Sequence, residues 1–247
     1  MSPLRCLYAS SLLLILHLQG LSQEAIFLSE GKIEFERKIN LYAQLGNDDT
    51  WSELQKKNMP QFKTAWFNLL FKKNRTLYAP GRENPENNRL QQQPAEDNIV
   101  WSDLDNGKFI SEKKVFEEIF LVQDSTRRIR WKMTDETRKI AGFNCRRANA
   151  MILDSTYVVA FYTDEILTPG GPESFTGLPG MILGIALPHE HITWFATRVQ
   201  AVPVADAELT APLKGKKVDN AALKQTLTQS LKSWGKYGLR YIQATML

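Results

Sequence analysis

Residues 99–111 read IVWSDLDNGKFIS, and this stretch decides the fold class. Two runs of strand-forming character, 99–104 and 108–111, flank the triplet Asp105-Asn106-Gly107. An Asn-Gly pair favours the left-handed backbone of a tight hairpin turn, so the two runs are predicted to pair as antiparallel neighbours. We therefore expect a sheet that grows from local hairpins, rather than alternating strands and helices.

Strand patterns continue on both sides of this hairpin. Residues 31–41 (GKIEFERKINL) alternate apolar and polar side chains, which is the period of a half-buried strand. A second hairpin is expected around Lys73-Asn74. Turn residues separate most of the remaining predicted strands, which are 66–72, 75–79, 116–123, 128–133, 138–151, 157–163, 181–187 and 191–202.

Two helices are predicted beside this sheet. Residues 50–53 (TWSE) form a capping-box pattern that opens a helix ending near Pro60. Asp219 or Asn220 can cap a later helix that ends at Gly235, and its apolar stripe consists of Leu223, Leu227, Leu231 and Trp234. The predicted fold class is α+β: an extended curved antiparallel sheet, a half-barrel-like meander, with a helix near the N-terminus and a C-terminal amphipathic helix.

The composition is that of an ordinary globular protein. The chain has 247 residues, of which 43% are hydrophobic, and a formal net charge of +4. These values exclude disordered, collagen-like and disulfide-scaffold proteins, and the charge is too small to indicate a nucleic-acid partner. Residues 80–98 are polar and rich in proline, so they are predicted to form a mobile loop inside a single domain, 23–247.

Residues 1–22 have the pattern of a cleaved export signal. Arg5 supplies the basic region, 7–18 are mostly apolar, and small residues precede a cleavage site placed after Ser22 or, alternatively, Gln23. The apolar run is too short to anchor the chain in a bilayer. The protein is therefore expected to be periplasmic or extracellular, without a transmembrane segment after signal removal. Cys145 then remains as its one cysteine, interpreted as a small buried hydrophobe.

The sharpest candidate for chemistry is His189-Glu190-His191. If this segment is extended, the two imidazoles project from one face and can chelate Cu or Zn, although a site needs further ligands. After Pro188, the same residues can instead form a polar turn between two strands. His189 and His191 are the candidate metal ligands under the first alternative.

No catalytic set can be assembled from the sequence, so the protein is predicted not to be an enzyme. Cys145 lacks a cysteine-protease signature, and the adjacent Asp164 and Glu165 would point to opposite faces of a strand. The glycines at 177–180 lack phosphate-loop spacing and are typical of a type II turn. The basic side chains between 127 and 147 are interpreted as a solvated strand face.

Several ordered blocks resemble the GLPGLI family of exported Bacteroidetes proteins. The blocks are Trp131, 137–148 (TRKIAGFNCRRA), 161–166 (FYTDEI, with Phe161 in place of Trp), Gly171-Pro172, 175–177 (FTG) and 177–182 (GLPGMI, with Met181 in place of Leu). The resemblance implies a Gram-negative source and a periplasmic or outer-membrane-associated location. It also implies a TonB-dependent outer-membrane receptor as partner. The family is largely uncharacterised, so the resemblance implies no mechanism.

The leading hypothesis is a non-enzymatic periplasmic binding or adaptor protein that is accessory to such a receptor. Its concave sheet face would take an apolar ligand or a protein segment; the architecture is similar to the half-barrels of periplasmic lipoprotein carriers, an analogy of fold alone. The alternative is a protein that binds or delivers Cu or Zn through His189 and His191. One rim of the concave face is predicted to consist of Gly171, Pro172, Phe175, Gly177, Leu178, Pro179 and Gly180.

Overall fold

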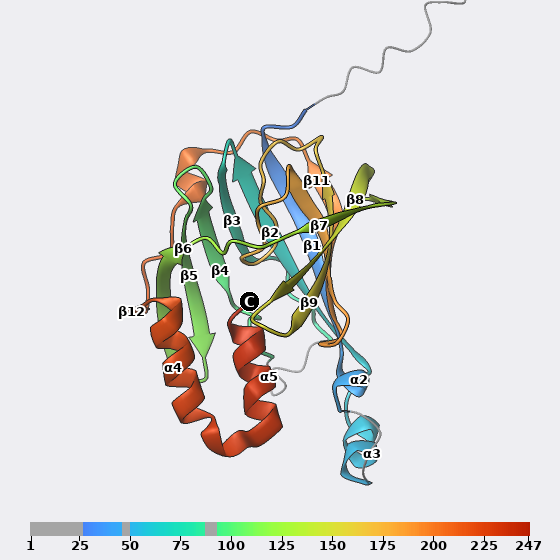
Figure 1. The fold of residues 1–247 in the computed structure, drawn as a ribbon, viewed down its shortest axis with the longest axis vertical. Coiled ribbons are helices and arrows are strands. Elements are labelled where there is room, and N and C mark those ends of the chain that lie inside the picture. The colour runs from blue at the N-terminus through green and yellow to red at the C-terminus, as the bar shows by residue number, and fades with distance from the viewer. Residues whose placement is uncertain (1–26, 46–49, 87–92) are drawn as a thin grey trace, which may run out of the picture.

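The computed structural model describes residues 27–45, 50–86 and 93–247, apart from the side chains of residues 50 and 51. These residues form one open, curved sheet of twelve strands (Figure 1). Neighbouring strands are antiparallel, except for β12 and β6, which are parallel. The predicted α+β class is confirmed.

From edge to edge the strands are β12 (Lys216–Val218), β6 (Glu118–Ser125), β5 (Lys108–Val115), β4 (Ile99–Asp103), β3 (Arg75–Pro80), β2 (Phe62–Lys72), β1 (Glu30–Asn40), β11 (Ile192–Gln200), β10 (Met181–Leu187), β9 (Thr156–Thr163), β8 (Phe143–Ile152) and β7 (Lys132–Ile140).

The hairpins that carry strong turn signals form as predicted. β4 and β5 pair in register around the Asn-Gly turn, where Gly107 has a φ of +59°. β2 and β3 pair around Lys73-Asn74, where Lys73 has a φ of +53°. In both cases the turn residues fix the register locally, so the pairing needs no information from distant parts of the chain.

The prediction of a single strand over 138–151 is wrong. This segment is a hairpin in which β7 and β8 reverse at Ala141-Gly142, with φ values of +48° and +93°. The apolar residues on both sides of Ala141 conceal the turn in the sequence. β7 is an edge strand that is exposed along most of its length and carries several charged side chains. Charged side chains on an edge strand hinder its pairing with strands of other chains. Its start at Lys132, and the start of β6 at Glu118, also shift from the predicted bounds.

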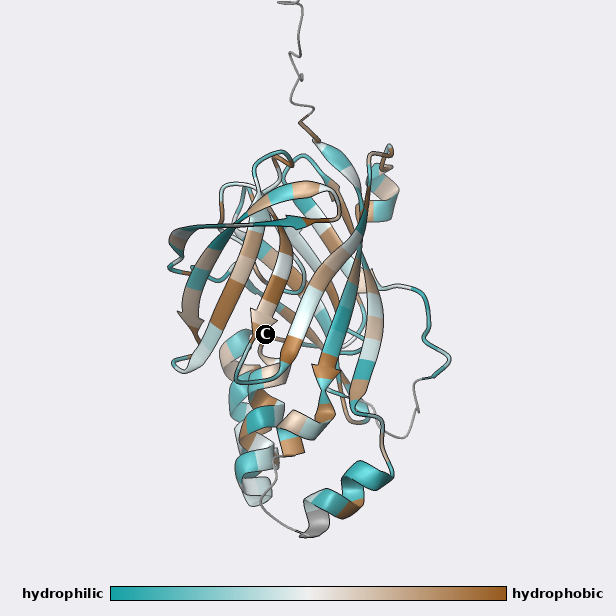
Figure 2. Ribbon diagram, turned by 90° about the vertical axis from the view of Figure 1, so that its right-hand side faces the viewer, coloured by the Kyte–Doolittle hydropathy of each residue, from teal (hydrophilic) through white to brown (hydrophobic). Residues whose placement is uncertain are grey.

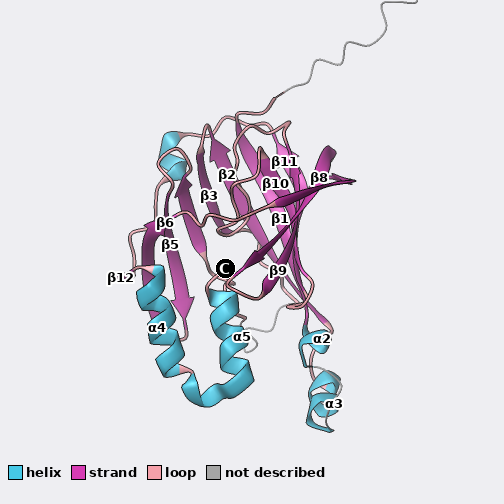
Figure 3. Cartoon of the chain, in the orientation of Figure 1, coloured by secondary structure: helices cyan, strands magenta, loops and turns pink. Residues whose placement is uncertain are grey.

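The α-helices lie at one end of the sheet, and a short 3-10 helix, Asp206–Leu209, lies at the other (Figure 3). α2 (Leu41–Leu45) follows β1 directly, and α3 (Thr50–Lys57) comes next, close to the predicted position. The predicted C-terminal helix is α4 (Asn220–Ser230), whose N-cap Asp219 accepts the Ala222 N–H at 2.7 Å. α4 ends at Ser230, before the predicted end at Gly235. After a short 3-10 turn, Lys232–Trp234, the chain reverses and forms α5 (Gly235–Thr245), which the sequence interpretation missed.

The core lies on the concave side of the sheet, where buried apolar residues of successive strands form one cluster with residues of α4 and α5. Figure 2 shows hydrophobic and hydrophilic residues alternating along several strands. In β1 the alternation places Ile33, Phe35 and Ile39 inside, as predicted. Among the described residues, no helix is long and apolar enough to cross a membrane. The predicted export signal, 1–22, lies outside the described residues.

The segment predicted as a mobile loop, 80–98, does connect β3 to β4, but its last part packs on the protein. Ala95 and Asn98 are buried. Glu96 forms an ion pair with Lys63, with 2.7 Å between Oε1 and Nζ. Residues 93–98 are therefore held against the sheet, while 87–92 lie outside the described residues.

Candidate functional site

A cavity of about 370 Å³ lies at the end of the sheet where the helices gather. The end of β1, α2 and the turn before β11 form one side, and α5 forms the other. Figure 1 shows α2 and α5 flanking this end of the sheet. The apolar part of the wall includes Ile39, Leu41, Met59, Ile192, Ala244 and Leu247.

Arg37 is the unexpected residue of this cavity. It follows Phe35 and precedes Ile39 on the inward face of β1, and only 1% of its surface is exposed. Its Nη2 donates to the Pro94 carbonyl at 2.9 Å, and its guanidinium lies 5.3 Å from the ring centroid of Trp194. Nε and Nη1 have no hydrogen-bond partner among the described residues. The cavity therefore borders a buried cation with spare donors.

Two further polar atoms on the cavity wall lack partners among the described residues. They are Oγ1 of Thr156, a residue that is 1% exposed, and Oε2 of Glu190. Burial raises the pKa of the Glu190 carboxyl above its ordinary value. Polar groups without hydrogen-bond partners are rare in protein interiors. Here the Arg37 guanidinium, the Thr156 hydroxyl and the Glu190 carboxylate oxygen all line one cavity, which indicates a binding site for a ligand or for water.

The inner end of α5 is held by three side chains that donate to carbonyl groups in its last residue and in the two residues after it. Nζ of Lys113 donates to the Thr245 carbonyl at 2.7 Å, and Nη2 of Arg127 donates to the Met246 carbonyl at 2.6 Å. The Ser174 hydroxyl donates to the Leu247 carbonyl. The last carbonyls of a helix have no partner within it, and cations at this end also complement the helix dipole. We call Lys113, Arg127 and Ser174 the α5 clamp.

Burial shifts the pKa values of one clamp residue and of a tyrosine near it. It lowers the pKa of Lys113 to about 8, against an attractive contribution from Glu173. Glu173 is itself buried and accepts from Asn98 Nδ2 at 2.9 Å. Burial, followed by the negative charge of Glu173, raises the pKa of Tyr78 well above its ordinary value. The concave face therefore encloses a connected set of charged and polar groups.

The two predicted metal ligands lie at the mouth of the cavity, in a turn. Residues 188–191 connect β10 to β11, and His191 has a φ of +56°. The extended alternative is thus wrong, and the polar-turn alternative is confirmed. His189 and His191 are both exposed, and His189 lies 6.4 Å from Tyr157 between ring centroids. No group of three or more His, Cys, Asp or Glu side chains in the described ranges is arranged to hold a metal ion. Copper or zinc binding stays a prediction.

Most residues of the glycine-rich turn are buried, and its role as a rim of a binding face stays a prediction. Phe175 has no exposed surface and packs edge-on against Trp194, with 6.3 Å between ring centroids. Gly180 has a φ of +134°, and a Cβ there would lie 2.1 Å from the Thr163 carbonyl oxygen, so only glycine fits. Of the seven predicted rim residues, Gly177 and Pro179 are exposed, and Gly171, Pro172, Phe175, Leu178 and Gly180 are buried.

The residues considered for catalysis do not line the cavity. Cys145 is buried, and desolvation, with a smaller contribution from Glu165, raises the pKa of its thiol to about 12. Glu165 accepts the Asn144 N–H at 3.3 Å. A thiol with this pKa is protonated at neutral pH and is a poor nucleophile.

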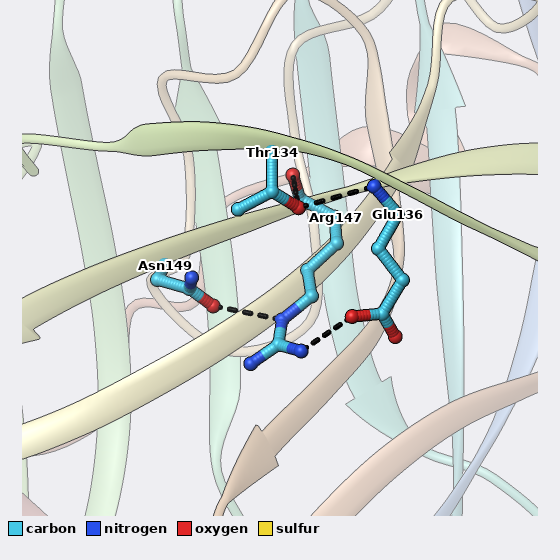
Figure 4. A network of polar contacts seen from close by, with 4 residues as sticks. All are labelled: Thr134, Glu136, Arg147 and Asn149. Atoms are coloured by element: carbon cyan, nitrogen blue, oxygen red, sulfur yellow. Dashed lines mark hydrogen bonds and ion pairs between the residues drawn. The ribbon is translucent and has the colours of Figure 1, made fainter.

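The basic stretch is mostly exposed, in line with its interpretation as a solvated face. Figure 4 shows one of its members, Arg147, which pairs with Glu136 and donates to Asn149. Thr134 completes this small network through the Glu136 N–H. Arg127 differs from this pattern, because it belongs to the α5 clamp. No feature of the sequence distinguishes it from its basic neighbours.

Comparisons with known proteins support the fold and leave the function open. A family model described as "Protein of unknown function (Porph_ging)" matches residues 150–184, a segment that contains the GLPGMI motif. This match is compatible with the resemblance to the GLPGLI family. No curated protein matches the chain.

Two solved structures share the architecture. They are two crystal forms of PNGF-II, in the P21 and C2 space groups, each with a TM-score of 0.53 and 16% sequence identity. The matches cover 80% and 79% of this chain, but this chain spans only about a third of theirs, 33% and 32%. At this level of identity the likeness shows a common fold alone.

Proposed function

We propose that this protein is an exported, non-enzymatic binding protein of the cell envelope that holds an apolar small molecule in the cavity beneath α5. The observation that carries the proposal is the cavity itself. Its volume of about 370 Å³ falls within the range of small-molecule sites, roughly 300–1,000 Å³, and its walls combine apolar side chains with a few polar groups.

The attachment of α5 supports a binding role. The clamp residues hold its inner end, whereas Trp234 and Tyr237, at its outer end, are about half exposed and also line the cavity. The half-exposed Trp234 and Tyr237 mark the part of the cavity wall that borders solvent, where a ligand can enter. In this proposal the protein lies in the cell envelope, as the predicted export signal and the family resemblance imply. Its partner there is a TonB-dependent outer-membrane receptor.

A neutral apolar probe tests this proposal. N-phenyl-1-naphthylamine is titrated into the purified protein, and its fluorescence is expected to rise to saturation at one equivalent. Ala244 lines the cavity from α5, so Ala244→Trp fills part of the space and is expected to weaken binding about tenfold or more. Ala221→Trp, at an exposed position of α4, is the matched control and should leave binding unchanged.

Two results would contradict the proposal. One is the absence of saturable binding by the wild-type protein. The other is binding that Ala244→Trp and Ala221→Trp affect equally, because the probe would then occupy a surface away from the cavity. Both variants are first compared with the wild type by circular dichroism and thermal unfolding, so that a loss of folding is not mistaken for a loss of binding.

A further inference from the structure

We propose that the ligand of this cavity is an anionic amphiphile: a single apolar chain with a carboxylate head group that binds Arg37. This inference rests on the proposed function and adds the chemistry of the ligand. It starts from the buried guanidinium on β1, which the binding of a purely apolar molecule would leave unexplained.

The hydrogen bonding of Arg37 is incomplete in a way that a carboxylate would complete. A guanidinium stays charged at any physiological pH and carries five N–H donors. In the described residues one nitrogen donates to the Pro94 carbonyl, the ring of Trp194 covers one face, and Nε and Nη1 have no acceptor. A buried charge without partners is costly, and a carboxylate provides both the opposite charge and the acceptor oxygens.

The charged side chains of the cavity wall leave Arg37 as the group suited to a carboxylate. Apart from the histidines, the basic side chains among the described lining residues are Arg37 and Arg240, and the acidic one is Glu190. Arg240 is exposed, and it already donates to the Gln44 carbonyl. Arg37 is therefore the buried cation of the lining that has unused donors.

The shape of the site favours one chain rather than two. At about 370 Å³ the cavity is near the lower end of the usual range for ligand sites, roughly 300–1,000 Å³, which leaves little room for a diacyl lipid. The apolar side chains that continue from Arg37 along the wall are Ile39, Leu41 and Ile192, and Ala244 faces them from α5. The hydroxyl of Thr156, also unpaired and buried, is a further donor available to the head group.

The test compares ligands that share one chain and differ in the head group. Dodecanoate, 1-dodecanol, dodecyl phosphate and dodecyltrimethylammonium are each titrated against the full chain by calorimetry, below their micelle concentrations. Dodecanoate is expected to bind at least about tenfold more tightly than 1-dodecanol, because a charge-assisted hydrogen bond is added. Arg37→Met is expected to abolish this difference, because dodecanoate then loses the charge-assisted hydrogen bond that 1-dodecanol never makes.

Two other variants locate the head group. Arg240→Met should keep the preference for dodecanoate, since Arg240 lies at the mouth; loss of the preference in Arg240→Met but not in Arg37→Met would overturn the proposal. Arg37→Gln keeps a polar side chain of similar length and repeats the test if Arg37→Met does not fold. Either Arg37 variant that folds must lose the preference.

The remaining outcomes separate the two proposals. Equal binding of dodecanoate and 1-dodecanol would refute the anionic ligand while leaving an apolar binding protein in place. A preference for dodecyl phosphate or for the trimethylammonium compound would assign a different head group and overturn the carboxylate. No binding of any of the four compounds, together with no binding of the neutral fluorescent probe, would reject the proposed function itself.

Discussion

Lys113 and Arg37 are both buried cations on the inward face of the sheet, yet their surroundings differ. Lys113, on β5, donates to the Thr245 carbonyl beside a space of only about 10 Å³, roughly the size of one water. Arg37, on β1, keeps two nitrogens without acceptors beside a cavity of about 370 Å³. The comparison indicates that Lys113 stabilises the fold, since it has an acceptor and almost no free space beside it. Arg37 has unused donors and a cavity beside it, so it is the cation that can bind a ligand.

The largest expected effect is the pH dependence of stability that Lys113 produces. Its pKa is about 8 in the folded chain, against an ordinary value of 10.5, so between these values the unfolded chain binds more protons. The free energy of unfolding should therefore rise with pH from 8 to 10.5, by up to about 3 kcal/mol, and Lys113 should contribute no slope below pH 8. Urea unfolding of the wild type and of Lys113→Met gives the unfolding free energy of each at several pH values between 8 and 10.5. The contribution of Lys113 is the change with pH in the difference between the two proteins. A difference that stays constant with pH would refute the prediction.

The second effect concerns the other cation of the α5 clamp. Arg127→Met leaves the Met246 carbonyl without its donor, and this should cost about 2 kcal/mol of unfolding free energy. Hydrogen exchange should also become faster along α5. Arg128→Met is the matched control, because Arg128 is the neighbouring residue and is exposed. Equal stability and equal exchange in the two variants would show that α5 is held by apolar packing alone.

The smallest expected effect on stability comes from Arg37. Without ligand, Arg37→Met should change the unfolding free energy by less than about 1 kcal/mol, although Arg37 is almost fully buried. The variant loses one hydrogen bond to Pro94 but also removes a charge with unpaired donors. A loss of several kcal/mol in urea unfolding would mean that Arg37 is a structural cation like Lys113, and the contrast between them would disappear.

The elements that sequence analysis predicted well are those encoded by neighbouring residues. The Asn-Gly turn between β4 and β5, the alternation in β1 and the cap at Asp219 each depend on a few adjacent side chains. The β7–β8 turn was missed because Ala141 is apolar. α5 was missed because its glycines and aromatic residues favour a helix only weakly, and its clamp comes from segments distant in the sequence.

The candidate site was only partly accessible from the sequence. His189 and His191 were singled out and do border the cavity, but as a turn rather than as an extended pair. Arg37 was overlooked although a signal existed, since it occupies an inward position of an alternating strand, between Phe35 and Ile39. Lys113 carries the same signal in β5. The cavity itself could not be foreseen, because it depends on how α5 meets the far end of β1.

The central claim, that Arg37 is a binding group, is tested most directly by the nuclear magnetic resonance signal of its Nε–H. Because Arg37→Met lacks this signal, comparison with the wild type assigns it in the side-chain region of a ¹H–¹⁵N spectrum. On addition of dodecanoate we predict that the Arg37 Nε–H signal shifts downfield and exchanges more slowly with water, whereas 1-dodecanol leaves it in place. An unchanged Arg37 signal while dodecanoate shifts the backbone signals of Ile39 and Ala244 would contradict the account.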